Sequence, residues 1–173
     1  MPESPLIAFY RGTGTDHAGR RLVDVLAWDD AELEAVHDYI QWLFPNVEPS
    51  RANSFAPLLT PADIATFRGD PTLQSTLLQS FERLLRFYGY RRSDSGEGGL
   101  AIEPSADWET HATNWLQPYN HNHLRLTRIM KCLTALGLEA EARALQRALL
   151  ETASRHMRLV SRTTLRYWTD AVS

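Results

Sequence analysis

Residues 70–89, DPTLQSTLLQSFERLLRFYG, are the stretch that decides the fold. Aspartate followed by proline is a typical helix start, and Gly89 is a typical residue just past a helix end. Between them the apolar residues recur every three or four positions, as they do along one face of a helix. These are Leu73, Leu77, Leu78, Phe81, Leu84, Leu85 and Tyr88. The stretch therefore predicts one long amphipathic helix.

The helical period recurs in both directions from this stretch, and no internal repeat is visible. Further helices are expected over residues 16–27, 30–44, 60–69, 120–137, 139–156 and 161–172. Residues 91–106, RRSDSGEGGLAIEPSA, are rich in glycine, serine and charge, and we expect a mobile surface loop there. The pattern predicts an all-α fold, with residues 1–173 forming a single compact domain of about seven helices.

The composition narrows the class of protein. A formal net charge of -3 gives no overall attraction to nucleic acid, so no nucleic-acid partner is expected. Cys132 is the only cysteine, which excludes an intramolecular disulfide and favours the reducing cytoplasm. No stretch approaches the ~20 apolar residues of a membrane-spanning helix, so we expect a soluble protein. Phosphate-binding glycine loops and dinucleotide fingerprints are absent, and no cofactor is expected.

A first candidate site lies in residues 37–45, HDYIQWLFP. At helical spacing the core face of residues 30–44 is formed by Leu33, Val36, Ile40, Leu43 and Phe44, with Glu34, Asp38 and Gln41 on a wetter side. His37, at the boundary, is either a proton-transferring group or a histidine satisfied by a nearby carbonyl. Tyr39 and Trp42 either pack against other helices or line a pocket.

A second candidate is the run from Asn120 to Arg128, NHNHLRLTR, at a helix start. His121, Arg125 and Arg128 fall on one stripe beside the positive end of the helix dipole. With free amides and two guanidinium groups, the run predicts a site for a carboxylate or phosphate. Alternatively, Asp38 or Glu34 pairs with the arginines and they are structural. A metal site using His121 and His123 is disfavoured, because the arginines repel a cation.

Two further features have structural interpretations. Cys132 falls near the stripe of Arg125 and Arg128, which would lower a thiol pKa, but a lone cysteine inside a helix is more often a small buried apolar residue. Four arginines surround the expected helix end at Gly89: Arg83, Arg86, Arg91 and Arg92. Cations there complement the helix dipole, and this explanation is preferred to a nucleic-acid patch.

HDYIQWLFP and NHNHLRLTRIMKCLTALGL, in this order, resemble the conserved domain of the opioid growth factor receptor family. The resemblance extends to FYRG near the N-terminus, WDDAELEAVHDYIQWLFP, LTPADIATFRG and RLLRFYGYR, and so covers nearly the whole chain. Helices rich in alanine, arginine and leucine suggest a bacterial member of the short, domain-only kind.

The resemblance implies a receptor-like function. Animal members are described as receptors for an opioid growth factor, the enkephalin pentapeptide, at membranes associated with the nucleus. They carry long additional C-terminal sequence, and bacteria and fungi also have members that consist of little more than the domain. No catalytic residues are established for the family, so the resemblance assigns none to this chain.

Together these observations predict a non-catalytic helical binding module for a small anionic ligand or a peptide. Its expected ligand-binding residues come from both motifs: His37, Tyr39, Gln41, Trp42, Asn120, His121, Asn122, His123, Arg125 and Arg128. One alternative is an enzyme with His37 or His121 as general acid or base on an anionic substrate. Another is a protein-interaction scaffold without a pocket, which would show an exposed apolar patch.

Overall fold

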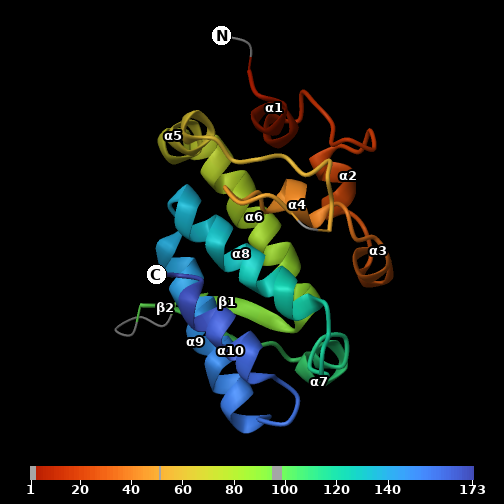
Figure 1. Cartoon of the computed structure of the whole chain (residues 1–173), viewed down its shortest axis with the longest axis vertical. Coiled ribbons are helices and arrows are strands. Elements are labelled where there is room, and N and C mark those ends of the chain that lie inside the picture. The colour runs from red at the N-terminus through yellow and green to blue at the C-terminus, as the bar shows by residue number, and fades with distance from the viewer. Residues whose placement is uncertain (1–2, 51, 95–98) are drawn as a thin grey trace. The chain divides into compact units, whose positions relative to one another are not determined.

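The computed structural model of the protein describes residues 3–50, 52–94 and 99–173. These residues form ten helices and one antiparallel pair of strands, which are labelled in Figure 1. In chain order they are α1 (Pro5–Arg11), α2 (Leu22–Leu26), α3 (Asp30–Ala35), α4 (Ile40–Leu43), α5 (Pro61–Gly69), α6 (Pro71–Tyr88), β1 (Tyr90–Asp94), β2 (Leu100–Pro104), α7 (Trp108–Ala112), α8 (Asn122–Leu136), α9 (Glu139–Arg155) and α10 (Arg162–Asp170).

The expected all-α fold of about seven helices is wrong, because β1 and β2 form a hairpin where a loop was expected. Tyr90 pairs with Pro104 and Asp94 with Leu100. The segment is polar, so its sequence does not indicate a buried strand, but tertiary contacts bury its start. The Tyr90 hydroxyl lies 2.7 Å from Thr152 Oγ1 of α9. Residues 95–98 of the expected mobile loop lie outside the described residues.

The chain divides into two compact units, residues 1–80 and 81–173, and each is described separately. In the first unit, Ser4 and Thr60 cap α1 and α5, and both also bond to Asp63. Ser4 Oγ donates to one carboxylate oxygen of Asp63 at 2.5 Å, and Thr60 Oγ1 donates to the other at 2.6 Å. One buried aspartate therefore joins two helix starts.

The single helix expected over residues 30–44 is interrupted. Asp29 caps α3 as expected, its carboxylate accepting from the Glu32 amide at 2.8 Å. Val36 then adopts an extended backbone with φ −89° and ψ 130°, and α3 ends there. The β-branched side chain favours this conformation, and the Asp38 carbonyl accepts instead from Asn53 Nδ2 at 3.3 Å. A long-range contact thus replaces helical continuation, and α4 begins at Ile40.

The helix expected over residues 16–27 is also shorter, because α2 covers only Leu22–Leu26. The carboxylate of Asp16 accepts hydrogen bonds from the amides of Ala18 and Arg20, both at 2.9 Å. This local competition for backbone donors holds residues 16–20 in a turn.

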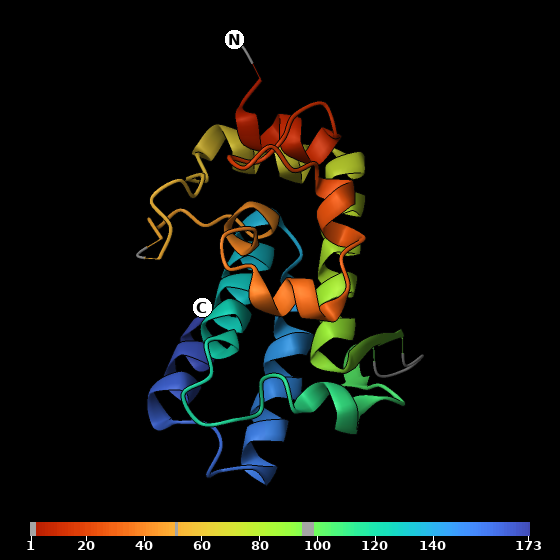
Figure 2. The ribbon, with the colours of Figure 1, turned by 90° about the vertical axis from the view of Figure 1, so that its right-hand side faces the viewer.

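The second unit contains the end of α6, the hairpin and α7 to α10. Figures 1 and 2 show α8, α9 and α10 side by side, and β2 packs on α9. Predicted boundaries are confirmed here: Gly137 ends α8 in the left-handed conformation, and Ser161 caps α10 by accepting from the Thr164 amide. The long helix predicted from residues 70–89 is confirmed as α6.

Candidate functional site

The best-defined polar and aromatic cluster of the first unit surrounds His17, which lies in the turn before α2. The ring of Phe55 stacks on His17 with centroids 5.7 Å apart and planes inclined by 6°. The ring of Trp42 in α4 is also nearly parallel to the imidazole, inclined by 16° with centroids 6.3 Å apart. Phe55 is 71% exposed, whereas Trp42 is buried. The cluster therefore presents one aromatic ring to solvent on a buried aromatic support.

Both ring nitrogens of His17 are engaged. Trp42 Nε1 donates to Nδ1 at 3.1 Å, and Nε2 lies 3.1 Å from Asp38 Oδ2. Because an indole can only donate, Nδ1 must accept, so the proton is assigned to Nε2, which donates to Asp38. Neither nitrogen is left to act as a general base, so the arrangement holds the ring in place and does not prepare it for proton transfer.

Asp38 is held by charge as well. Arg20 Nη1 lies 2.9 Å from Asp38 Oδ1, and Arg20 Nε donates to Asp16 Oδ2 at 2.6 Å. Burial raises the pKa of Asp38, but the hydrogen bond and charge of Arg20, with His17, outweigh it and hold the pKa below its ordinary value. The guanidinium also lies over the Trp28 ring, 5.5 Å from its centroid. The carboxylate beneath the aromatic cluster is therefore a fixed anion.

Asn53 positions the exposed ring. Its Oδ1 accepts from the Phe55 amide at 2.9 Å, while its Nδ2 donates to the Asp38 carbonyl at 3.3 Å. Nearby, the Leu59 amide donates to the Asn46 carbonyl at 3.0 Å, which brings together the two ends of the segment that carries Phe55. Val47 and Leu58, close to those ends, are 58% and 49% exposed. We call Val47, Phe55 and Leu58 the apolar surface.

The structure disperses the site residues expected in the first motif. His37 is exposed. Tyr39 is buried and its hydroxyl donates to the Leu33 carbonyl at 3.1 Å, so it packs in the core. Gln41, expected on the wetter side, is also buried, and its Oε1 accepts from Asn53 Nδ2 at 3.4 Å. Trp42 belongs to the His17 cluster.

The second motif forms the start of α8 in the other unit, and its amides are used internally. Asn120 Oδ1 accepts from the Asn122 amide at 2.9 Å, and the Asn120 carbonyl accepts from the His123 amide at 3.1 Å. The Leu124 amide donates to the His121 carbonyl at 3.1 Å. The expected supply of free amides for an anion is therefore not available at these three positions.

Side chains of this motif mostly enter the core. Asn122 is fully buried; its Oδ1 accepts from Arg125 Nη1 at 3.3 Å and from the Tyr88 hydroxyl at 3.4 Å. Arg125 is buried, Arg128 is half-buried and His121 is exposed. These three therefore differ in exposure, although they lie on one helical stripe.

His123 belongs to an aromatic cluster. Its Nε2 donates to the Trp115 carbonyl at 2.9 Å, and the backbone carbonyl of His123 accepts from Trp168 Nε1 at 3.1 Å. Burial lowers the pKa of His123, an effect that the bond to Trp115 opposes and the charge of His121 reinforces. The residue is a neutral core histidine.

Two other expectations concern Cys132 and metals. Cys132 is fully buried, and burial raises the pKa of its thiol although Arg128 lowers it. It is therefore a core residue and not a reactive thiolate. In the described part of the chain, no group of three or more histidine, cysteine or carboxylate side chains is arranged to hold a metal ion. Nor does any described helix have the length and apolar character needed to cross a membrane.

Sequence reasoning missed His17 and Phe55. Phe55 is a large aromatic residue in a polar segment with two prolines, and this was the available signal. His17 follows Asp16, whose carboxylate accepts from the Ala18 amide and forms a turn. Because a helix was expected from residue 16, this turn was not predicted.

Comparison with known proteins identifies relatives over most of the chain. The model of the opioid growth factor receptor (OGFr) conserved region matches residues 20–173, a range that includes Trp42 and Phe55 and begins just after His17. The human opioid growth factor receptor is 37% identical over 153 residues, covering 86% of this chain and 22% of that protein. The rat protein of that name is 37% identical over 136 residues, covering 77% of this chain and 23% of its own length.

A second group of relatives bears a related name. The opioid growth factor receptor-like protein 1 of Xenopus tropicalis is 35% identical over 111 residues, covering 64% of this chain and 21% of that protein. The chain thus spans less than a quarter of the length of these relatives. No solved structure matches the chain significantly.

Proposed function

The chain belongs to the opioid growth factor receptor conserved-region family, and we propose that it is a non-catalytic binding module that takes a peptide on the apolar surface around Phe55. One observation carries the proposal. Phe55 is 71% exposed, yet His17 stacks on it and Asn53 fixes its backbone. A large ring that is both exposed and held in place is typical of a binding surface, because it loses little conformational freedom when a partner covers it.

The surroundings of Phe55 suit a peptide. Val47 and Leu58 add exposed apolar area, and Asp38 supplies a fixed carboxylate beside His17. Apolar side chains of a peptide would cover the three exposed residues, and its amides or an amino group would bond to Asp38. The relatives are named as receptors for opioid growth factor, which makes a peptide ligand the first class to test.

Binding is proposed in preference to catalysis. Both nitrogens of His17 are engaged in hydrogen bonds, and His37 and His121 lie at the exposed surface. Exposed imidazoles lack the water-excluded surroundings that make acid–base groups effective. The buried Asn122, His123 and Arg125 are assigned to the core of the second unit and left out of the proposed surface.

The test uses the full chain with two probes, the enkephalin pentapeptide and a phage-displayed library of random peptides. We expect the wild-type protein to enrich or bind peptides that the Phe55→Ala variant binds at least about tenfold more weakly. Met157→Ala is the matched control, since Met157 is 78% exposed and lies in the other unit. The proposal is wrong if neither probe binds, or if Phe55→Ala binds as the wild type does.

A further inference from the structure

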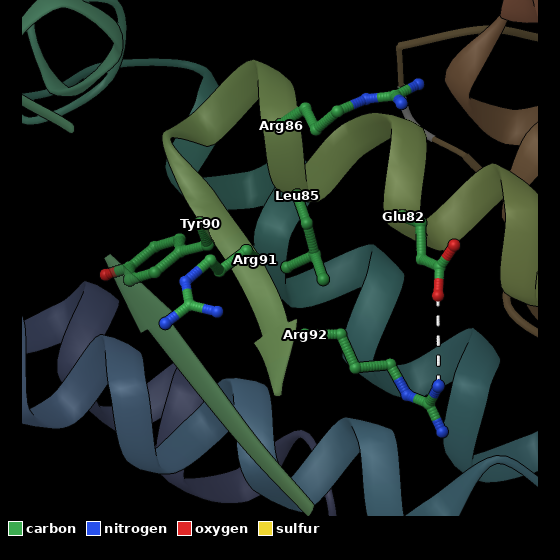
Figure 3. Close-up of a pocket in the computed structure, with 6 residues that line it drawn as sticks. All are labelled: Glu82, Leu85, Arg86, Tyr90, Arg91 and Arg92. Carbon is green, nitrogen blue, oxygen red and sulfur yellow. Dashed lines mark ion pairs between the residues drawn. The ribbon is translucent and has the colours of Figure 1, made fainter. Parts of the chain in front are cut away.

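Charged side chains gather around a hollow of about 250 Å³ between the last turns of α6 and strand β1, within the second unit (Figure 3). Arg91 donates to Glu103 Oε2 at 2.8 Å across the hairpin. Arg92 lies within ion-pair distance of two carboxylates, with Nη1 3.9 Å from Glu82 Oε1 and Nη2 3.6 Å from Glu141 Oε1. The protein itself therefore neutralises these arginines, and we assign no ligand to this hollow.

The His17 cluster of the first unit contains a titratable ring whose two protonation states cannot share one geometry. In the neutral ring, Nδ1 accepts from Trp42 Nε1 at 3.1 Å, and the protonated Nε2 donates to Asp38 Oδ2 at 3.1 Å. A second proton can enter only at Nδ1, because Nε2 already carries one. The imidazolium would then point an N–H group at the indole N–H group, with no acceptor between them. Protonation of His17 therefore breaks its bond to Trp42.

Of these two rings, His17 is the one that can move. Trp42 is buried and packs edge-on against Phe9 of α1, with centroids 5.4 Å apart. His17 lies in the turn before α2 and its side chain is 21% exposed, so water can reach an imidazolium that turns outward. Phe55 stacks on this same imidazole with planes inclined by 6°. Displacement of His17 therefore removes the ring on which the exposed Phe55 rests.

Three charged side chains bond to His17 or to its partners among the described residues. Asp38 attracts a proton on His17, while Arg20, 2.9 Å from Asp38 and 2.6 Å from Asp16, repels it. Burial raises the pKa of Asp38, but Arg20 and His17 hold it below its ordinary value, so this carboxylate stays ionised in mild acid. Imidazole is the side chain that ordinarily titrates between pH ~5 and ~8. His17 is therefore the group of this cluster that can respond to mild acid.

We propose that His17 is a pH-sensitive switch of the apolar surface. With a neutral ring it supports Phe55 and the surface binds a peptide, whereas with a protonated ring it turns away from Trp42 and Phe55 loses its fixed position. The consequence for binding rests on the proposed peptide function, but the conformational step is a property of the free protein. If a peptide binds the neutral form alone, its dissociation constant rises by up to about tenfold per pH unit once His17 is mostly protonated.

The conformational step is measured on the full chain without ligand, by NMR between pH 8 and pH 5. We expect the ring signals of His17 and Phe55 and the indole N–H signal of Trp42 to shift with one common midpoint. His17→Gln keeps an acceptor for Trp42 and a donor for Asp38 but does not titrate, so the shifts of Trp42 and Phe55 should be lost. His37→Gln, at an exposed position of the same unit, should titrate as the wild type does.

Trp42→Phe separates the switch from a general effect of charge. Its side chain places no donor opposite Nδ1, so His17 should still titrate in this variant while the Phe55 signals no longer follow it. A ring of Phe55 that responds only to the nearby charge would shift in Trp42→Phe as it does in the wild type, and this result contradicts the switch. Circular dichroism at each pH shows that the proteins compared are folded.

Binding is measured at pH 7.5 and pH 5.5 with the enkephalin pentapeptide and with peptides that the random library yields at pH 7.5. We expect wild type to bind at least about fivefold more weakly at pH 5.5, and His17→Gln to bind equally at both values. Absence of binding at pH 7.5 rejects the proposed peptide function, and the ligand-free titration then decides the switch by itself. Three results would each overturn the switch: unchanged Trp42 and Phe55 signals in wild type, the same shifts in His17→Gln, or a peptide bound equally by wild type at both pH values.

Discussion

Trp42 Nε1 donates a 3.1 Å hydrogen bond to His17 Nδ1, across 25 positions of the sequence. On its other side the same imidazole lies 3.1 Å from the carboxylate of Asp38. The indole thereby determines which nitrogen of His17 carries the proton, and this N–H donates a hydrogen bond to the carboxylate. A proton on Nδ1 would point at the N–H of Trp42, so that two donors would face each other without an acceptor. The ring that supports Phe55 is thus held in one tautomer and one orientation.

The first prediction removes this donor. In Trp42→Phe, His17 Nδ1 loses its partner and a buried ring shrinks, so the free energy of unfolding should fall by about 1–3 kcal/mol. Urea denaturation followed by circular dichroism measures the loss, and Tyr167→Phe on an exposed ring should show none. ¹⁵N NMR should find Nδ1 unprotonated in the wild type. A protonated Nδ1 there would contradict the assigned tautomer.

The second prediction concerns pH. Burial lowers the pKa of His123 in the folded state, so as pH falls below the ordinary histidine value of about 6.5 the unfolded chain takes up a proton first. Stability is therefore fully present above that pH and is lost as pH falls toward the folded-state pKa. The slope can reach about 1.4 kcal/mol per pH unit for one proton. Denaturant unfolding at pH 7.5 and pH 5.5 measures it.

Two variants distinguish the contribution of His123 to the pH dependence of stability from that of the other histidines. His123→Gln keeps a donor for the Trp115 carbonyl but does not titrate, so the difference in stability between the two pH values should shrink. His156→Gln, at an exposed position after α9, should leave the difference as in the wild type. Equal pH dependence in wild type and His123→Gln would show that another group is responsible.

The third prediction compares two capping aspartates. Asp29→Ala removes one exposed cap and should cost about 1 kcal/mol. Asp63→Ala removes a buried carboxylate that accepts from both the Ser4 and the Thr60 hydroxyls, and should cost about 2–3 kcal/mol. Thermal or urea unfolding of both variants measures the difference. Equal losses would mean that the link between the starts of α1 and α5 adds nothing.

Local signals explain which parts of the fold the sequence predicts. Thr60, Asp29 and Ser161 each accept from a backbone amide three residues later, so their caps are visible in short stretches of sequence. The hairpin was missed because what buries it is distant: Tyr90 reaches Thr152, 62 positions away. The break after α3 likewise depends on a bond from Asn53. The spacing of apolar residues within a segment does not reveal contacts between residues far apart in the sequence.

The candidate site was harder to predict for the same reason. Trp42 was identified as a residue that packs or lines a pocket, but its partner His17 lies in a segment where a helix was expected. The polar run at the start of α8 was also misinterpreted. Asn122 and His123 were expected to bind a ligand, but they are buried and bond to Tyr88 and to the Trp115 carbonyl. A dense polar motif at a helix start can serve the core as readily as a ligand.

The fourth prediction contrasts two glycines at the ends of neighbouring helices. Gly89 has φ +83°, and a Cβ there would lie 3.0 Å from His111 Cβ and 3.2 Å from the Trp108 ring. Gly89→Ala should therefore lower the free energy of unfolding by about 1–2 kcal/mol from backbone strain, with a further loss from the crowded neighbours. Gly69 is helical, has an ordinary φ, and a Cβ would meet nothing within 4 Å. Gly69→Ala should raise the same quantity by about 0.4–1 kcal/mol, because alanine favours the helix and restricts the unfolded chain. Urea unfolding of the two variants under identical conditions measures both changes, and changes of the same sign would refute the conformational argument.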